Sequence, residues 1–210
     1  MAERPVRARR VVAVLVALAV GAVLAACSPS KPAAQGPPTT PAPPRQVFVA
    51  LGGSETLNLA RNSDLPDDWT QLVFTQALST SAVHVDLANG DGTVQNALDV
   101  QLPDAVALHP TIATVWVGAA DVRNGTGSIT FRDELSQLVA RLQAAGTRRI
   151  LLLSQPSTMP SGGGDYTAAV GRVARDSGAT LVTLGPVAAP LDDAGQRAIA
   201  APVIAALRRR

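Results

Sequence analysis

The feature that most constrains the fold is a regular alternation, across residues 46–210, of short apolar runs with helix-length segments. The runs are rich in Val, Ile, Leu and Thr and too short for helices, which predicts buried strands. They cover Gln46–Leu51, Ala82–Leu87, Ile112–Val117, Arg149–Leu153 and Thr180–Leu184. The two tryptophans, Trp69 and Trp116, are expected in the core.

The segments between these runs predict helices, and glycine follows two of them, where a helix commonly ends. They cover Asp67–Leu78, Thr93–Val100, Thr130–Ala145, Tyr166–Ser177 and Asp193–Leu207, and the two glycines are Gly146 and Gly178. Strands separated by helices predict a parallel sheet with helices on both faces. We therefore expect a single α/β domain with a sizeable core over residues 46–210.

In parallel α/β sheets the functional crevice lies beyond the carboxyl ends of the strands. Turns that contain glycine follow the first three predicted strands, at Gly53, at Gly90 and Gly92, and at Gly118. Backbone N–H groups that converge in such turns suit an anion or an oxyanion. Ser54, which follows the first strand, is the candidate nucleophile at this crevice.

Residues 1–26 predict a cleavable secretory signal, because four arginines precede an apolar stretch, Val11–Ala25, that is too short to span a bilayer. Leu24–Cys27 resembles the bacterial lipobox, in which the cysteine is acylated and the leader is cut just before it. We therefore expect export and a lipid on Cys27 that anchors the protein to the outer face of the bacterial cytoplasmic membrane, in the cell envelope. The alternative is an ordinary signal peptide with a chance cysteine.

Residues 27–45 contain seven prolines and almost no large apolar side chain, which predicts an extended linker. The net charge of the full chain is +2, and the leader, with four Arg and one Glu, accounts for +3 of it. The rest therefore carries −1 and has no basic patch interleaved with aromatics, so nucleic acid is not an expected partner. With a single cysteine and two dispersed histidines, neither a disulfide, a metal site nor a cofactor is predicted.

Five stretches in register resemble the SGNH, or GDSL, hydrolase family of esterases and acylhydrolases. Val49–Ser54 resembles the first family block, which usually reads Gly-Asp-Ser, and Asp86–Val94 resembles the second block. Leu102–Asp121 resembles the stretch that ends in the third block, which usually reads Gly-x-Asn-Asp. Tyr166–Val170 resembles the family's late helix, and Asp193–Gly195 resembles the run after its catalytic histidine. The resemblance implies a flavodoxin-like three-layer α/β/α sandwich with a five-stranded parallel sheet. This agrees with the fold class that the alternation of strands and helices predicts.

The resemblance also implies a serine hydrolase site, of which this chain has only part. Ser54 stands at the position of the nucleophile, and its backbone N–H at that of the first oxyanion donor. Either Gly90 or Gly92 stands at the second donor. Ala120 stands where the family has an asparagine side chain as the third donor, and loss of one such donor costs about 3–4 kcal/mol of transition-state stabilisation.

Four further positions matter to the implied mechanism. Gly53 replaces an aspartate that orders the serine loop in the family, whereas Asp121 keeps the aspartate of the third block, whose usual role is to order a loop. The histidine base is expected at Pro190, and its carboxylate partner near Val187. Neither partner of the serine is therefore present.

The chain has two other histidines and two nearby aspartates that could replace the base. His84 lies within a predicted strand, roughly 16 Å from the crevice, and His109 precedes the third strand at its amino end. Both are expected to be packing or surface residues. Asp192 and Asp193 are the candidate substitutes as acid or base, although Asp193 is expected rather to be the N-cap of the last helix.

Two functions remain open at this point. In the first, the crevice has lost triad catalysis and binds an envelope ligand, such as a glycan, a lipid or a small acyl ester. In the second, the protein is an active esterase that acts on small acyl esters or acylated envelope glycans, with Ser54 and a non-standard base. Turnover of a simple ester that depends on Ser54 distinguishes the two.

Overall fold

A computed structural model of the chain describes residues 45–57, 68–90, 92–156, 163–187 and 192–209. Its centre is a five-stranded sheet with the order β2-β1-β3-β4-β5, in which every neighbouring pair is parallel. The strands are β1 (Val47–Gly52), β2 (Val83–Asp86), β3 (Ile112–Trp116), β4 (Arg149–Leu153) and β5 (Thr180–Val182). The predicted parallel sheet is confirmed, with strand ends moved by one or two residues. The predicted leader, Cys27 and linker as far as residue 44 lie outside the described residues.

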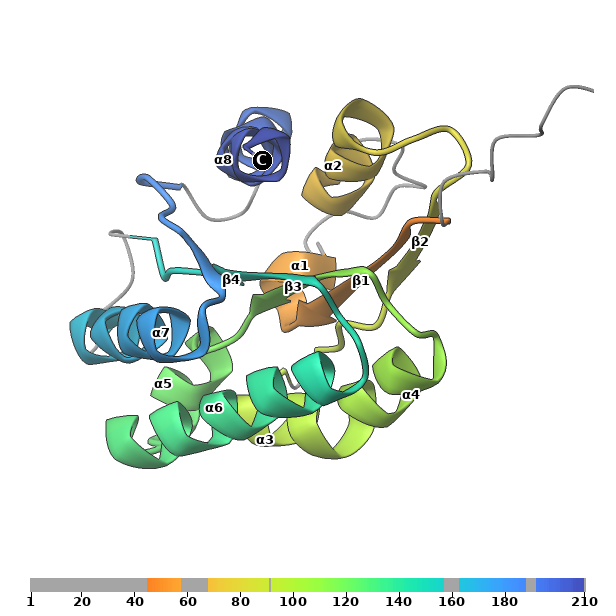
Figure 1. Cartoon of the computed structure of the whole chain (residues 1–210). Coiled ribbons are helices and arrows are strands. Elements are labelled where there is room, and N and C mark those ends of the chain that lie inside the picture. The colour runs from red at the N-terminus through yellow and green to blue at the C-terminus, as the bar shows by residue number, and fades with distance from the viewer. Residues whose placement is uncertain (1–44, 58–67, 91, 157–162, 188–191, 210) are drawn as a thin grey trace, which may run out of the picture. The chain divides into compact units, whose positions relative to one another are not determined.

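Helices cover both faces of the sheet and complete the three predicted layers (Figure 1). They are α1 (Ser54–Leu57), α2 (Trp69–Ala77), α3 (Val94–Asn96), the π-helical turn η1 (Ala97–Gln101), α4 (Leu102–Ala107), α5 (Ala119–Asn124), α6 (Ser128–Ala144), α7 (Gly163–Ser177) and α8 (Asp193–Arg208). One face carries α2 and α8, and the other carries η1, α4, α6 and α7. Among the described residues, none of these helices is long and apolar enough to cross a bilayer.

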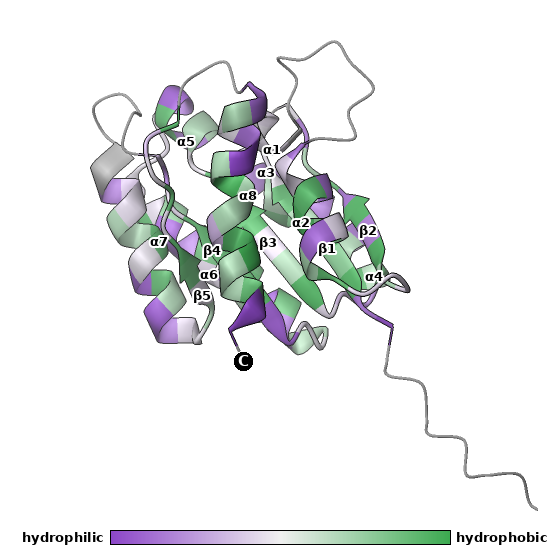
Figure 2. Ribbon diagram, turned by 90° about the horizontal axis from the view of Figure 1, so that it is seen from above, coloured by the Kyte–Doolittle hydropathy of each residue, from purple (hydrophilic) through white to green (hydrophobic). Residues whose placement is uncertain are grey.

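Alternate residues of β1, β3 and β4 fill two separate cores, one on each face of the sheet. Val49 and Val115 point to the core under α6 and α7, whereas Phe48 and Trp116 point to the core under α2 and α8. Figure 2, which looks down on α2 and α8, shows the hydrophobic residues of the strands beneath them. Trp69 packs edge-on against Trp116, with ring centroids 6.1 Å apart, so both tryptophans belong to the core as predicted.

Three details differ from the sequence-based expectation. The helix predicted to end at Val100 continues through η1 and α4 to Ala107, with Pro103 in the first turn of α4, where a missing N–H costs little. Helices α1 and α5 were not predicted, since four and six residues are too few to show a period. The N-cap of α8 is Asp192 and not Asp193, because Asp192 Oδ1 accepts the Gly195 N–H at 2.8 Å.

The last helix is tied to the start of β4 by Arg149. Its guanidinium donates to the carbonyl oxygens of Leu207 at 2.7 Å and Ala206 at 2.8 Å, and to that of Arg209 at 3.1 Å. Terminal helix carbonyls have no partner within the helix, so a cation there satisfies them and also complements the helix dipole. The C-terminus of α8 is therefore fixed at the amino edge of the sheet.

Candidate functional site

Ser54 lies at the carboxyl edge of the sheet, as the sequence predicts. It is the first residue of α1, directly after β1, and its side chain is half-buried. The preceding turn is fixed by two backbone hydrogen bonds, from the Gly53 N–H to the Trp116 carbonyl (3.4 Å) and from the Thr56 N–H to the Gly53 carbonyl (3.0 Å). The end of β3 thus helps to position the hydroxyl-bearing loop.

The side-chain amide of Gln101 forms hydrogen bonds with the backbone just before that loop. Its Oε1 accepts the Gly52 N–H and its Nε2 donates to the Gly52 carbonyl, both at 2.9 Å. Gln101 is only 2% exposed, and it comes from η1, the π-helical turn between α3 and α4. This paired contact fixes both polar groups of the last residue of β1.

Two asparagines extend this network to the loop after β2. Gln101 Nε2 also donates to Asn96 Oδ1 at 3.2 Å, and Asn89 Nδ2 donates to the same oxygen at 2.8 Å. The Asn89 backbone N–H in turn donates to the Gly52 carbonyl at 3.2 Å. The loops after β1 and β2 are therefore held together by side-chain amides, none of which the sequence analysis identified.

Gly92 packs directly on the backbone beneath Ser54. A Cβ atom on Gly92 would lie 2.2 Å from Gly53 Cα and 2.4 Å from the Gly52 oxygen, which no side chain can do without moving the backbone. Its N–H donates to the Asn89 carbonyl at 3.2 Å, while Gly90 is exposed. Residue 91, between them, lies outside the described residues, so which of Gly90 and Gly92 faces an oxyanion stays a prediction.

Asp121 joins the loop after β3 to the helix that follows the β2 loop. Its fully buried carboxylate accepts the Val94 N–H at 3.1 and 3.3 Å. Burial raises the pKa of Asp121 to about 6, and the hydrogen bonds from Val94 and Thr126 oppose that rise. Asp121 is thus a loop-ordering residue, which is the role that the sequence analysis expected for it.

A second acid near this edge behaves in the same way. Asp86 ends β2 and accepts the Ala88 N–H at 2.9 Å, and burial raises its pKa to about 6. Burial also lowers the pKa of His84, so protonation of His84 on acidification destabilises the folded state, whereas protonation of the two acids stabilises it. The two acids can therefore be tested only by comparison with a variant that lacks their titration.

We expect the free energy of unfolding of the parent, relative to an Asp86→Asn/Asp121→Asn variant, to rise as the pH falls from about 7 to about 5. The folded state binds these protons more tightly than the unfolded chain, whose aspartates have a pKa of 3.8, so stability is lost as the pH rises toward about 6. Urea unfolding at both pH values measures the difference. An identical change in both proteins would exclude these two carboxyls as its source.

Gly118 and Ala120 follow β3 at the same edge. Gly118 has a φ of 122°, and a Cβ there would lie 2.5 Å from Gln155 Nε2, which donates to the Val117 carbonyl. Ala120 is buried at 5% exposure in the first turn of α5. A methyl group donates no hydrogen bond, so the side chain of Ala120 supplies nothing to an oxyanion.

Neither histidine of the chain lies at this edge. The His84 ring is within β2, stacked between Phe48 (centroids 5.1 Å apart) and Phe74 (5.6 Å). His109 is exposed and precedes β3, at the amino edge. Both positions agree with the expectation of a packing and a surface histidine.

The segment where the family has its base and carboxylate is described only at its ends. Val187, near which the family's carboxylate is expected, has an apolar side chain that is buried at 8% exposure in the core under α8. Asp192 is exposed and caps α8, and Asp193 is the first helical residue and half-buried. Pro190 lies outside the described residues.

The polar network under Ser54 is the part of the site that sequence reasoning missed. The sequence contains one sign of this network, a glutamine at a position that faces the core. Gln101 stands between the apolar residues Leu98 and Leu102, whose side chains point to the core. A glutamine in such a position needs partners, since burial of an unsatisfied amide is costly.

Comparisons with known proteins agree with this geometry. The GDSL-like lipase/acylhydrolase family matches residues 48–202. Among solved structures, the chain is similar to TesA (20% identity, TM-score 0.65, covering 78% of this chain and 98% of that one). It is also similar to the acetylxylan esterase Axe2 from Geobacillus stearothermophilus (14%, TM-score 0.67, 79% and 95%). A third is the psychrotrophic esterase EstA from Pseudoalteromonas sp. (17%, TM-score 0.62, 78% and 97%).

A search of curated proteins gave no match. The similar structures share less than a quarter of their residues with this chain, so they support its fold. The family match spans most of the domain, including the loops that carry Ser54, Gly92 and Asp121. The chain therefore belongs to the GDSL-like lipase/acylhydrolase family.

Proposed function

We propose that this protein is an exported, lipid-anchored member of the family that binds an ester-bearing envelope ligand at its crevice and has lost triad hydrolysis. Its leader (residues 1–26) is removed, the lipid is attached to Cys27, and residues 27–45 act as the spacer. The ligand class is an acylated envelope glycan or lipid, because the family acts on acyl esters and the anchor restricts the domain to the envelope.

The observation that carries the loss of catalysis is the position of the two histidines, the only ones in the chain. The His84 ring stacks on Phe48 and Phe74 between the sheet and α2, and His109 is at the opposite edge from Ser54. A serine hydroxyl needs a base within about 3 Å to become a nucleophile. Removal of the base alone costs several orders of magnitude in rate.

Two other positions support the same proposal. Ala120 replaces the third oxyanion donor with a methyl group, and Val187 is an apolar core residue where the family's carboxylate is expected. By contrast, the amide network, Gly92 and Asp121 order the loops around Ser54. Ordered loops around Ser54 that lack proton-transfer groups favour binding over turnover.

One observation favours a second function, that of an active esterase. Ser54 remains at the start of α1 with a half-buried side chain, at the position that resembles that of the family's nucleophile. In this case the base would be a carboxylate such as Asp192 or Asp193. Because the two functions differ in turnover, one pair of measurements separates them.

We expect residues 46–210 to hydrolyse a short-chain p-nitrophenyl ester no faster than a Ser54→Ala variant does, because no imidazole takes the serine proton. A fluorophosphonate probe should likewise leave Ser54 unlabelled. Titration with O-acetylated peptidoglycan fragments should show binding that a Ser54→Phe variant, with its crevice filled, lacks. Turnover that disappears in Ser54→Ala would establish the esterase instead, and absence of binding in the parent would reject the ligand class.

A further inference from the structure

Most charged residues of the domain are divided between the two edges of the sheet, although Arg123, Arg132 and Arg197 lie near the carboxyl edge. Arginines gather at the amino edge, where strands begin and helices end, namely Arg45, Arg148, Arg149, Arg208 and Arg209, joined by Arg141 and Arg175 in the last turns of α6 and α7. Acids gather at the carboxyl edge, namely Asp68, Asp86, Asp121, Asp165, Asp192 and Asp193. Only Asp104 and Asp176, among the described acids, lie toward the arginines.

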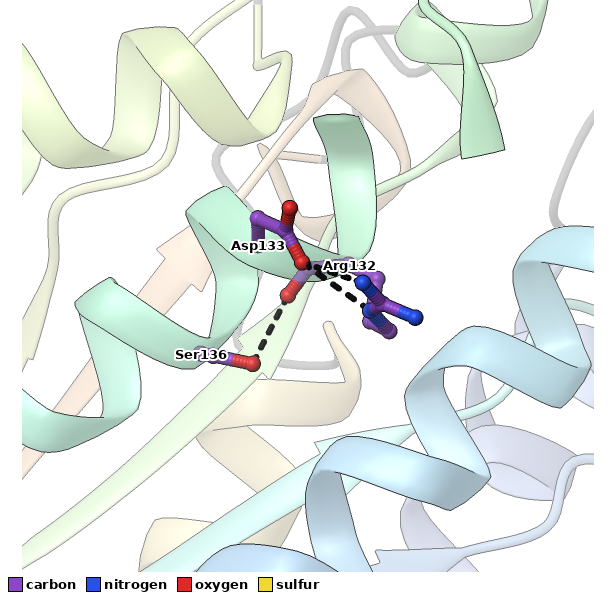
Figure 3. Close-up of polar contacts among 3 residues, drawn as sticks. All are labelled: Arg132, Asp133 and Ser136. Carbon is purple, nitrogen blue, oxygen red and sulfur yellow. Dashed lines mark hydrogen bonds and ion pairs between the residues drawn. The ribbon is translucent and has the colours of Figure 1, made fainter. Parts of the chain in front are cut away.

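The hydrogen bonds of these arginines leave their positive charge in place. Arg45 donates to the Ser81 carbonyl at 3.2 Å, Arg208 to the Gln76 carbonyl at 3.2 Å, and Arg149 to the end of α8. All of these acceptors are uncharged backbone oxygens. By contrast, Arg132, in the first turns of α6, is paired with Asp133 at 2.7 Å (Figure 3).

Compensation of helix dipoles explains only part of this arrangement. Cations in the last turn of a helix are stabilising, which accounts for Arg141, Arg175 and Arg208. Arg45 and Arg148 precede strands and belong to no helix, and both are exposed. The amino edge is therefore more basic than helix stability requires.

A groove opens beside this basic edge, between β5 and α8. It has a volume of about 650 Å³ and is lined by Arg149, Arg209, Thr180, Leu181 and Pro202, among others. Leu181 is 41% exposed, one of the few large apolar side chains that the domain exposes in its described part. Arginines beside an exposed leucine match the polar–apolar boundary of a bilayer, where cations meet phosphates and apolar groups enter the headgroup layer.

The first described residue of the chain lies at the same edge. Because all strands are parallel, Val47 at the start of β1 lies at the amino edge, as does the end of α8 (Figure 2). Residues 1–44 therefore join the domain at the basic edge. A lipid on Cys27 would keep this edge within reach of the headgroups, at a high effective concentration.

We propose that the amino edge of the sheet, represented by Arg148 and Arg209, is a docking surface for an anionic lipid bilayer. Anionic headgroups attract basic side chains near the surface, each arginine strengthening binding by about fivefold. In this orientation the crevice with Ser54 faces away from the membrane, toward the envelope. The surface is separate from the crevice, so it does not depend on whether the domain hydrolyses or binds its ligand.

The test uses residues 43–210 without any lipid, since both cores lie within them and they form one compact unit. We expect the domain to sediment with vesicles of phosphatidylglycerol and phosphatidylcholine, but not with phosphatidylcholine alone. An Arg148→Glu/Arg209→Glu variant should bind at least about 25-fold more weakly. These two side chains are exposed, unlike Arg149, which is required to hold α8.

The matched control is Arg123→Glu/Arg197→Glu, which changes the net charge equally with two exposed arginines of α5 and α8 near the carboxyl edge. This control and an Arg148→Lys/Arg209→Lys variant should keep most of the binding, and circular dichroism verifies the fold of each variant. Equal loss in both charge-reversed variants, or no binding to anionic vesicles, would overturn the proposal. Binding to soluble polyphosphate but not to vesicles would also overturn it, in favour of a polyanion site.

Discussion

Replacement of Gly92 by alanine is expected to destabilise the domain by about 3 kcal/mol, the upper range for a forced steric overlap in a packed interior. The added methyl group would lie 2.2 Å from Gly53 Cα, 2.4 Å from the Gly52 oxygen and 2.5 Å from the Gly53 nitrogen. All three are backbone atoms, so no side-chain rotation relieves the overlap. The loops after β1 and β2 must separate, and Ser54 moves with them.

Gly185→Ala is the matched control, since a Cβ at Gly185 has no atom within 4 Å and its φ is not positive. We expect it to change the free energy of unfolding by less than about 0.5 kcal/mol. Urea unfolding followed by far-UV circular dichroism measures both variants. Equal stability of the two would mean that the Gly92 loop is free to move away from the Gly52–Gly53 peptide, contrary to the close packing described above.

Replacement of Gln101 by methionine is expected to destabilise the domain by about 3 kcal/mol, because it keeps the side-chain volume and removes the amide. The buried Gly52 N–H then has no acceptor, and Asn96 Oδ1 keeps only the bond from Asn89. The Gly52 carbonyl still accepts the Asn89 N–H, so this carbonyl keeps one hydrogen bond. An orphaned buried donor is the larger part of the cost.

Gln95→Met provides the comparison, since Gln95 is exposed and its amide bonds only Asp99 at the surface, at 2.6 Å. A change below about 0.5 kcal/mol is expected there. The two variants differ in burial and not in chemistry, so denaturant midpoints at equal slope give the contribution of the network. If Gln101→Met were as stable as Gln95→Met, water or a rearranged Asn96 would have to replace the lost amide.

The fold was predictable from the sequence because its strands are buried on both faces. Such strands appear as uninterrupted apolar runs, and Arg149–Leu153 was predicted with the bounds that the structure has. Gly146 and Gly178 also have the positive φ values, 90° and 75°, of the predicted helix ends. These signals are local, and each was readable within a window of a few residues.

The helix after β2 shows why other parts were not predictable. A π-helical turn adds a residue to the helical repeat, so the apolar period that marks a helix shifts at η1, and Pro103 then resembles a stop. The N-cap of α8 was misplaced by one residue since Asp192 and Asp193 are equally suited to cap. Neither ambiguity is resolved by the sequence, because tertiary packing decides both.

The candidate site was predicted at the level of loops but not of contacts. Ser54, Gly92 and Asp121 follow three neighbouring strands, so their gathering at one edge follows from the parallel topology alone. The partners of Gly52 could not be foreseen, because Gln101 is 49 residues away and reaches it only through the bulge of η1. Long-range amide contacts of this kind leave no periodic trace in a sequence.

The attachment of α8 to Arg149 has a consequence for how the protein is made. Helix α8 supplies Ile199, Val203 and Ile204 to one core, and its Gln196 Oε1 accepts the Trp69 N–H at 2.8 Å. That core is incomplete until α8 has been synthesised, since α8 covers the side of it that faces away from the sheet. The core under α6 and α7 contains no residue of α8, so the core that holds Trp69 and Trp116 is the last that can form as the chain is made.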